Sequence, residues 1–78
     1  MQEYKIVAYG LAEKIADKAA EWLYDQGQSP SILGMDVDDG EVKAVNVAVD
    51  LQATALFESF VRGRYQSRLE GVKLYRLV

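Results

Sequence analysis

The sequence predicts an α+β sandwich: a four-stranded antiparallel sheet with two helices on one face. Three observations predict it. Strand and helix patterns alternate in the order βαββαβ, a tight turn at Asp39-Gly40 joins the two middle strands, and the strand after that turn is apolar at nearly every position. Two βαβ-like halves joined by a hairpin form a ferredoxin-like fold, and the handedness of the crossovers gives the strand order 4-1-3-2.

The composition limits the chemistry open to this chain. Its 78 residues are one domain (1–78) without Cys or His, which excludes disulfides, cysteine nucleophiles and histidine bases. The net charge of −3 and a pI near 4.8 argue against a nucleic-acid backbone as a partner. No apolar run could span a membrane, so we expect a cytoplasmic (or host cytoplasmic) protein. We expect no cofactor.

The first half reads as a strand followed by a helix. Tyr4–Tyr9 is aromatic and β-branched and stops at Gly10, which predicts a strand. A helix is predicted from Leu11 to about Gln26, ended by Gly27 and Pro30. Its apolar stripe follows the helical period and consists of Ala12, Ile15, Ala16, Ala19, Trp22 and Leu23.

The predicted hairpin joins strands at Ser31–Val37 and Val42–Val49. Because the second of these is apolar on both sides, we expect it to be a central strand. We expect Val42 and Ala44 to pack under Trp22 and Phe57, since small residues such as Ala44 suit the face of the sheet that the two helices cover. The larger side chains of Val45, Val47 and Val49 would then lie on the opposite face. Asn46 shares the helix-side phase in this prediction.

The rest of the chain reads as a second helix and a last strand. Asp50 is a suitable N-cap for a helix from Leu51 to about Arg62, and Gly63 is expected to end it. Its inward stripe is Ala53, Leu56, Phe57, Phe60 and Val61. A basic loop spans residues 64–68, and residues 72–77 alternate as a strand.

Parts of the second half resemble the acylphosphatase family: Asp39-Gly40-Glu41-Val42 at the turn, and Leu69-Glu70-Gly71-Val72-Lys73-Leu74 before the last strand. The resemblance implies hydrolysis of acyl phosphates. The family's glycine-rich phosphate loop is not matched, however, because Glu13 and Lys14 stand within it. Lys18 replaces the family's arginine and Asp36 its asparagine. A lysine cannot form the bidentate phosphate contact of an arginine, so we expect the activity to be lost.

Our leading functional expectation is a non-catalytic protein-interaction module that acts through the open face of its sheet. An apolar sheet face in so small a chain favours a protein partner or a second copy, a homodimer. The expected interface residues are Tyr9, Val45, Val47, Val49, Tyr75 and Leu77.

Two other functions stay open. A divergent hydrolase would use Lys18 and Asp36, with anion contacts from Arg62, Arg64 and Arg68. A small acidic inhibitor, of the type that mobile elements or phages encode, would imitate a phosphate backbone with the row Glu13, Asp17, Glu21 and Asp25. The acidic residues near the hairpin turn do not have the spacing of a calcium loop, so no metal site is predicted.

Overall fold

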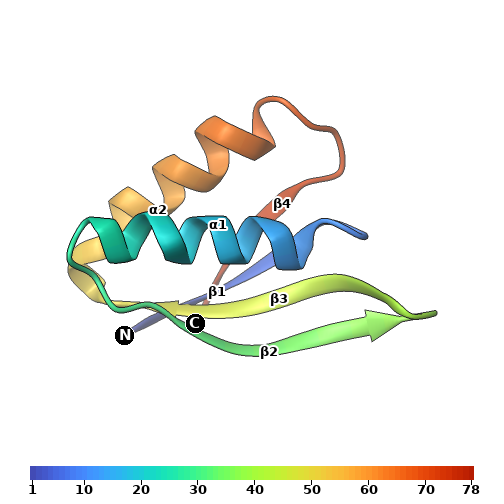
Figure 1. Cartoon of the computed structure of the whole chain (residues 1–78), viewed down its shortest axis with the longest axis horizontal. Coiled ribbons are helices and arrows are strands. Elements are labelled where there is room, and N and C mark those ends of the chain that lie inside the picture. Colours follow the sequence, from blue (N-terminus) through green and yellow to red (C-terminus); the bar gives the residue numbers. More distant parts are fainter.

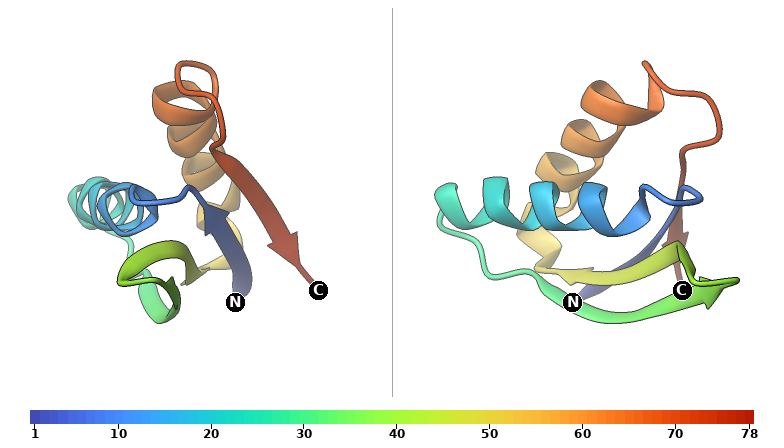
Figure 2. Two further views of the ribbon diagram at one scale, coloured as in Figure 1. Left: turned by 90° about the vertical axis from the view of Figure 1, so that its right-hand side faces the viewer. Right: turned by 45° about the vertical axis from the view of Figure 1, so that its right-hand side comes forward.

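The computed structural model describes residues 1–78, which form the predicted sandwich (Figure 1). The elements in order are β1 (Gln2–Val7), α1 (Ala12–Asp25), β2 (Ser31–Asp38), β3 (Glu41–Val49), a 3₁₀ turn (Leu51–Ala53), α2 (Thr54–Val61), a π-helical turn (Arg62–Gln66) and β4 (Lys73–Leu77). All neighbouring strands are antiparallel, in the order β2-β3-β1-β4, which confirms the predicted order and fold. Both helices lie on one face of the sheet (Figures 1 and 2).

The tight turn between β2 and β3 forms as predicted. Asp39 and Gly40 both have positive φ, 54° and 79° respectively, the combination that a two-residue hairpin turn requires. β3 follows and lies between β2 and β1, which confirms its central position.

The helix α1 buries the predicted stripe against the sheet. Its buried residues are Ala12, Ile15, Ala16, Ala19, Ala20 and Leu23. Trp22 is only half-buried, and its ring packs against Phe60 of α2 with the centroids 5.1 Å apart. Aromatic packing therefore joins the two helices above the core. The alanines of α1 allow this helix to lie close to the sheet.

The second helical segment is longer and less regular than predicted. The Asp50 carboxylate accepts a hydrogen bond from the Gln52 N–H, as expected of an N-cap, but the first turn is 3₁₀. Gly63 does not end the helix, because one π-helical turn continues to Gln66. The prediction for Leu56 is also wrong: its side chain is exposed, while Ala53, Phe57, Phe60 and Val61 are buried.

The predicted phase of β3 is wrong beyond Val42. Val45, Val47 and Val49 are at most 1% exposed and belong to the core under the helices. Val42 does pack against this core as predicted. The phase changes between these residues because Val37 pairs with Val42 while Asp36 pairs with Ala44, a β-bulge that leaves Lys43 as an extra residue on β3.

The open face of the sheet is consequently mixed rather than apolar. Residues that alternate with the buried Tyr4 and Ile6 lie on it, together with their cross-strand partners. These are Glu3, Lys5 and Val7 of β1, Ala44, Asn46 and Ala48 of β3, Lys73, Tyr75 and Leu77 of β4, and Ser31, Gly34 and Asp36 of β2. Burying three valines and leaving the amide of Asn46 on this face avoids the cost of an unpaired polar group in the core.

None of the helices combines the length and the apolar character that crossing a bilayer requires.

Candidate functional site

β2 contributes no residue to the buried core. Every other strand has buried residues, but β2 has none over its eight positions. Four of those positions are nevertheless large and apolar. We call these side chains the β2 surface: Ile32, Leu33, Met35 and Val37, which are 40%, 52%, 45% and 60% exposed.

The helix layer leaves this strand uncovered because α1 packs mainly against β3 rather than against β2 (Figure 1). Ile32, Met35 and Val37 pair with helix-side residues of β3 and so lie on the helix side of the sheet, yet no helix covers them. A single isolated apolar side chain at a surface is ordinary, whereas an edge strand with four of them within six residues is unusual, and three of the four form an apolar strip on the helix side.

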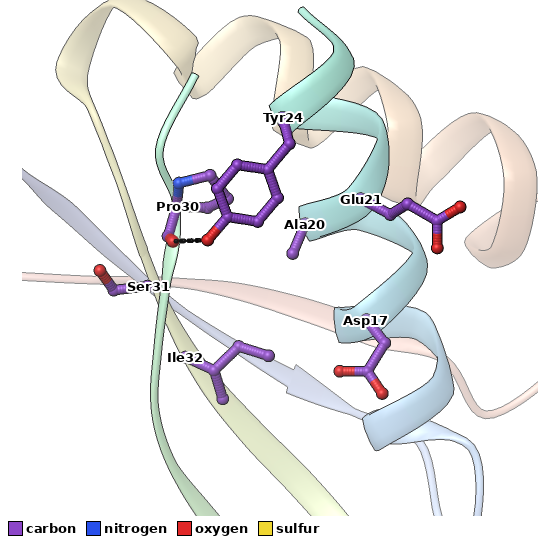
Figure 3. A pocket seen from close by; sticks show the side chains of 7 residues that line it. All are labelled: Asp17, Ala20, Glu21, Tyr24, Pro30, Ser31 and Ile32. Carbon is purple, nitrogen blue, oxygen red and sulfur yellow. Dashed lines mark hydrogen bonds between the residues drawn. The ribbon is translucent and has the colours of Figure 1, made fainter. Parts of the chain in front are cut away.

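A groove of about 620 Å³ separates α1 from the start of β2. Figure 3 shows its floor, formed by Ala20 and Ile32, and its end, where the Tyr24 hydroxyl donates a hydrogen bond of 3.2 Å to the Pro30 carbonyl. The Asp17 side chain lies over the groove on the side of Ile32, while the Glu21 carboxylate points outward at its rim. We call this hollow the β2 groove; its lining is Asp17, Ala20, Glu21, Tyr24, Pro30, Ser31 and Ile32.

The acidic row predicted on α1 is exposed and unpaired. Its four residues all face solvent, and none of them takes part in the three ion pairs of the structure. Two members, Asp17 and Glu21, border the β2 groove. These two residues form what we call the acidic wall, and it lies beside the apolar floor of the groove.

The outer edge of β2 has no partner strand. β2 pairs only with β3. The backbone N–H and C=O groups of every second residue point to the other edge, where no strand pairs with them. The register break at Leu33 lies within β2, but the break near Val37 comes from an extra residue of β3. Residues 34–38 of β2 therefore run without interruption.

The six residues predicted as an interface do not form one surface. Val45, Val47 and Val49 are core residues. Tyr75 is exposed on the open face and Leu77 is half-buried there. Tyr9 is exposed after β1, and its hydroxyl donates to the Asp38 carbonyl at 3.2 Å. The valine surface that motivated a homodimer is thus absent, and the homodimer itself stays a prediction.

The arginines predicted as an anion site are used separately. Arg62 forms an ion pair of 2.8 Å with Glu58, and the guanidinium of Arg64 stacks over the Phe60 ring at 4.8 Å. Arg68 is exposed and has no ion pair. These three side chains therefore do not converge on a common point.

Lys18 and Asp36, the residues that the acylphosphatase resemblance implies, also lie apart. Lys18 lines a hollow between α1 and the end of the second helical segment. Asp36 lies on the open face of the sheet, where Lys5 pairs with it at 3.3 Å. The sheet separates the two residues, and hydrolysis by this pair stays a prediction.

A polar cluster on the helix side of the sheet was not predicted. The buried Tyr4 hydroxyl donates to Glu58 Oε2, and Arg76 Nη2 donates to the same oxygen at 2.9 Å. The hydrogen bond from Tyr4 lowers the pKa of Glu58 below its ordinary 4.5, and the charges of Arg62 and Arg76 lower it further. Burial, followed by the hydrogen bond to Glu58, raises the pKa of Tyr4 above 10.0.

The β2 surface was also missed, although the sequence contains a signal for it. Ile32, Leu33, Met35 and Val37 occupy both phases of a strand that the order 4-1-3-2 places at an edge. Edge strands are normally short or carry charges and prolines, so four large apolar side chains at an edge are unusual.

Comparison of the chain with models of protein families, with curated proteins and with solved structures found no match.

Proposed function

We propose that this chain is a small protein-binding module whose contact surface is the β2 surface together with the β2 groove. The observation that carries the proposal is that an eight-residue strand with four large apolar side chains buries none of them. Keeping such a strip in water costs free energy that contact with another protein recovers. The proposal keeps protein interaction as the function and moves its surface from the sheet face to the edge.

The open face supports binding less well. Its apolar residues are interspersed with Glu3, Lys5, Asp36 and Lys73, and two of these charges already pair with each other. Interspersed charges of both signs are typical of a solvated surface. Tyr75 is the large apolar side chain that stands most exposed there.

A matched pair of variants tests the proposal. Met35→Lys and Tyr75→Lys introduce the same charge at side chains of nearly equal exposure, 45% and 47%, on the β2 surface and the open face. Each protein, with the wild type, is used to capture partners from a lysate of the cells that produce it. We expect a partner that Tyr75→Lys retains and Met35→Lys loses. Loss by Tyr75→Lys alone would assign the function to the open face, and retention by both variants would overturn the β2 surface.

A second candidate function is an acidic inhibitor that occupies the nucleic-acid site of a basic protein. The observation that favours it is the row Glu13, Asp17, Glu21 and Asp25, which is exposed and forms no ion pairs. Reversing Glu13 and Asp25, which lie outside the β2 groove, to lysine separates the two candidates. Capture that depends on these two residues and not on Met35 supports the inhibitor; capture that ignores them opposes it.

A further inference from the structure

We propose that β2 accepts an extended, basic segment of a partner protein as a fifth strand of the sheet, with arginine or lysine side chains of that segment against Asp17 and Glu21. This inference rests on the proposed function and specifies the partner's chemistry and the geometry of its binding. It combines three features of the same side of the molecule: a free strand edge, an apolar strip and an acidic wall.

The free edge determines the conformation of the partner. Residues 34–38 of β2 offer backbone donors and acceptors along an unbroken run, and β3 occupies only the other edge. An extended segment satisfies these groups in the way that a neighbouring strand does, whereas a helix has no backbone groups free to do so.

The strip next to that edge suits long side chains with apolar stems. Ile32, Met35 and Val37 lie on the helix side of β2, and each remains at least 40% exposed. Side chains on the helix side of a fifth strand would lie directly beside them. The stems of lysine and arginine cover apolar surface in this way while their charged ends extend further, here toward α1.

The acidic wall determines the charge of the partner. α1 runs beside β2 in the opposite direction (Figure 1), and Asp17 and Glu21 border the groove between them. These two residues are one helical turn apart, a rise of ~6 Å. Alternate side chains on one face of a strand are ~6.7 Å apart, so basic residues at positions i and i+2 match the spacing of Asp17 and Glu21 along α1.

The carboxylates of β2 itself argue against a second copy as the occupant. Antiparallel pairing of β2 with its counterpart along residues 34–38 would place the two α1 helices on the same side of a continuous sheet. A register centred on Val37 would set Asp36 of each copy opposite Asp38 of the other. Like charges at such distances oppose association, whereas a basic segment neutralises them.

The probe for the test is a capped eight-residue peptide of alternating arginine and valine, titrated into ¹⁵N-labelled protein. Strand addition predicts slower amide exchange at alternate residues between Gly34 and Asp38, and shift changes at Asp17 and Ala20. The control peptide has the same sequence with every backbone nitrogen methylated, which keeps its charge and removes the N–H donors on both edges. We expect this control to bind at least ten-fold more weakly.

Charge is tested with two double variants. Asp17→Asn with Glu21→Gln removes the acidic wall, while Glu3→Gln with Glu70→Gln removes two exposed carboxylates elsewhere. We expect the first pair to weaken binding of the peptide roughly 2- to 30-fold at low salt, as two exposed ion pairs contribute, and the second pair to change it little.

Each alternative has its own outcome. Equal binding of the methylated peptide would show attraction by charge alone and overturn strand addition. Slowed exchange at the same amides that grows with protein concentration, without peptide, would assign the edge to a second copy. Absence of any change at millimolar peptide would also overturn the inference. None of these results decides the capture comparison of Met35→Lys with Tyr75→Lys, so the proposed function succeeds or fails separately.

Discussion

The carboxylate of Glu58 connects three elements of the fold. It accepts hydrogen bonds from Tyr4 of β1 and Arg76 of β4 on one oxygen, and pairs with Arg62 through the other. Tyr4 is fully buried, so its hydroxyl has no access to water as an alternative partner. The aromatic body of Tyr4 meanwhile packs on Phe57, with ring centroids 4.7 Å apart. The Tyr4 hydroxyl also accepts a hydrogen bond of 3.3 Å from Arg76, so this one side chain contributes both apolar packing and polar contacts.

Removing that hydroxyl gives a pH-dependent loss of stability. Tyr4→Phe leaves the ring in place, and we expect the free energy of unfolding at pH 7 to fall by about 1.5–3 kcal/mol, as for a buried hydrogen bond to a charged group. The folded-state pKa of Glu58 is lowered, so its contribution is present above 4.5 and is lost as the pH falls through the folded value. The deficit of Tyr4→Phe should therefore shrink between pH 5 and pH 2.

Urea denaturation of the wild type and Tyr4→Phe across this range measures the effect, with Tyr75→Phe at the exposed tyrosine as control. The pKa of Tyr4 is raised, so in the wild type the tyrosine's contribution holds below 10.0 and is lost as the pH rises through the folded value. A deficit that stays constant from pH 7 to pH 2 would contradict the coupling of Tyr4 to Glu58.

At the scale of elements, the phase of β3 determines which valines support the fold. Val47 is 1% exposed beneath the helices, whereas Val37 on the neighbouring strand is 60% exposed. We expect Val47→Ala to reduce the free energy of unfolding by about 2 kcal/mol and Val37→Ala by less than ~0.5 kcal/mol. Thermal and urea unfolding of the two variants provide the comparison. Similar losses at both positions would contradict the assignment of β3's inner face.

Two glycines respond oppositely to alanine because their backbones differ. Gly40 has φ of 79° in the hairpin turn, so Gly40→Ala should destabilise the protein by about 1 kcal/mol. Gly63 lies within the continuing helix, and a Cβ there would meet no atom within 4 Å. Gly63→Ala should stabilise the protein by roughly 0.5–1 kcal/mol. Melting temperatures that move in the same direction in both variants would contradict this account.

The elements themselves were predictable because their signals are local. The stripe of α1, the turn at Asp39-Gly40 and the N-cap at Asp50 each depend on a few neighbouring residues, and all three are present in the structure. The phase of β3 was not predictable by alternation from Val42, because the bulge at Lys43 inserts one residue and reverses every later position. Asn46 did indicate the observed phase, since a polar amide favours the face of the sheet that is exposed to solvent.

The candidate site depends on packing between distant segments, which explains why the sequence indicated it only weakly. Whether Ile32 and Met35 are covered depends on where α1 crosses the sheet, and α1 lies over β3. Residue patterns place α1 on one face of the sheet but do not give its lateral position. The acidic row, in contrast, could be predicted from spacing alone, and all four of its residues are exposed.

For the whole molecule, charge and the exposed edge together predict how it self-associates. Near the pI of 4.8 the repulsion between copies is smallest, and the β2 surface becomes free to pair non-specifically. We expect light scattering to rise at pH 4.8 relative to pH 7.5, and to rise less for Met35→Lys than for Tyr75→Lys. Both substitutions change the net charge equally, so equal scattering by the two variants would show that charge alone controls association.

The position of the chain ends has a different consequence. Glu3 of β1 pairs with Leu77 of β4, and the Gln2 side chain donates to the Leu77 carbonyl at 2.6 Å, so residues 1 and 78 lie side by side (Figure 1). A short flexible linker can join them, and the chain can be reopened at the Asp39-Gly40 turn. In this circular permutant β2 becomes the last segment of the chain. It can then be shortened residue by residue, or omitted and added back as a separate peptide. The binding constant of that peptide measures the free energy with which β2 associates with β3.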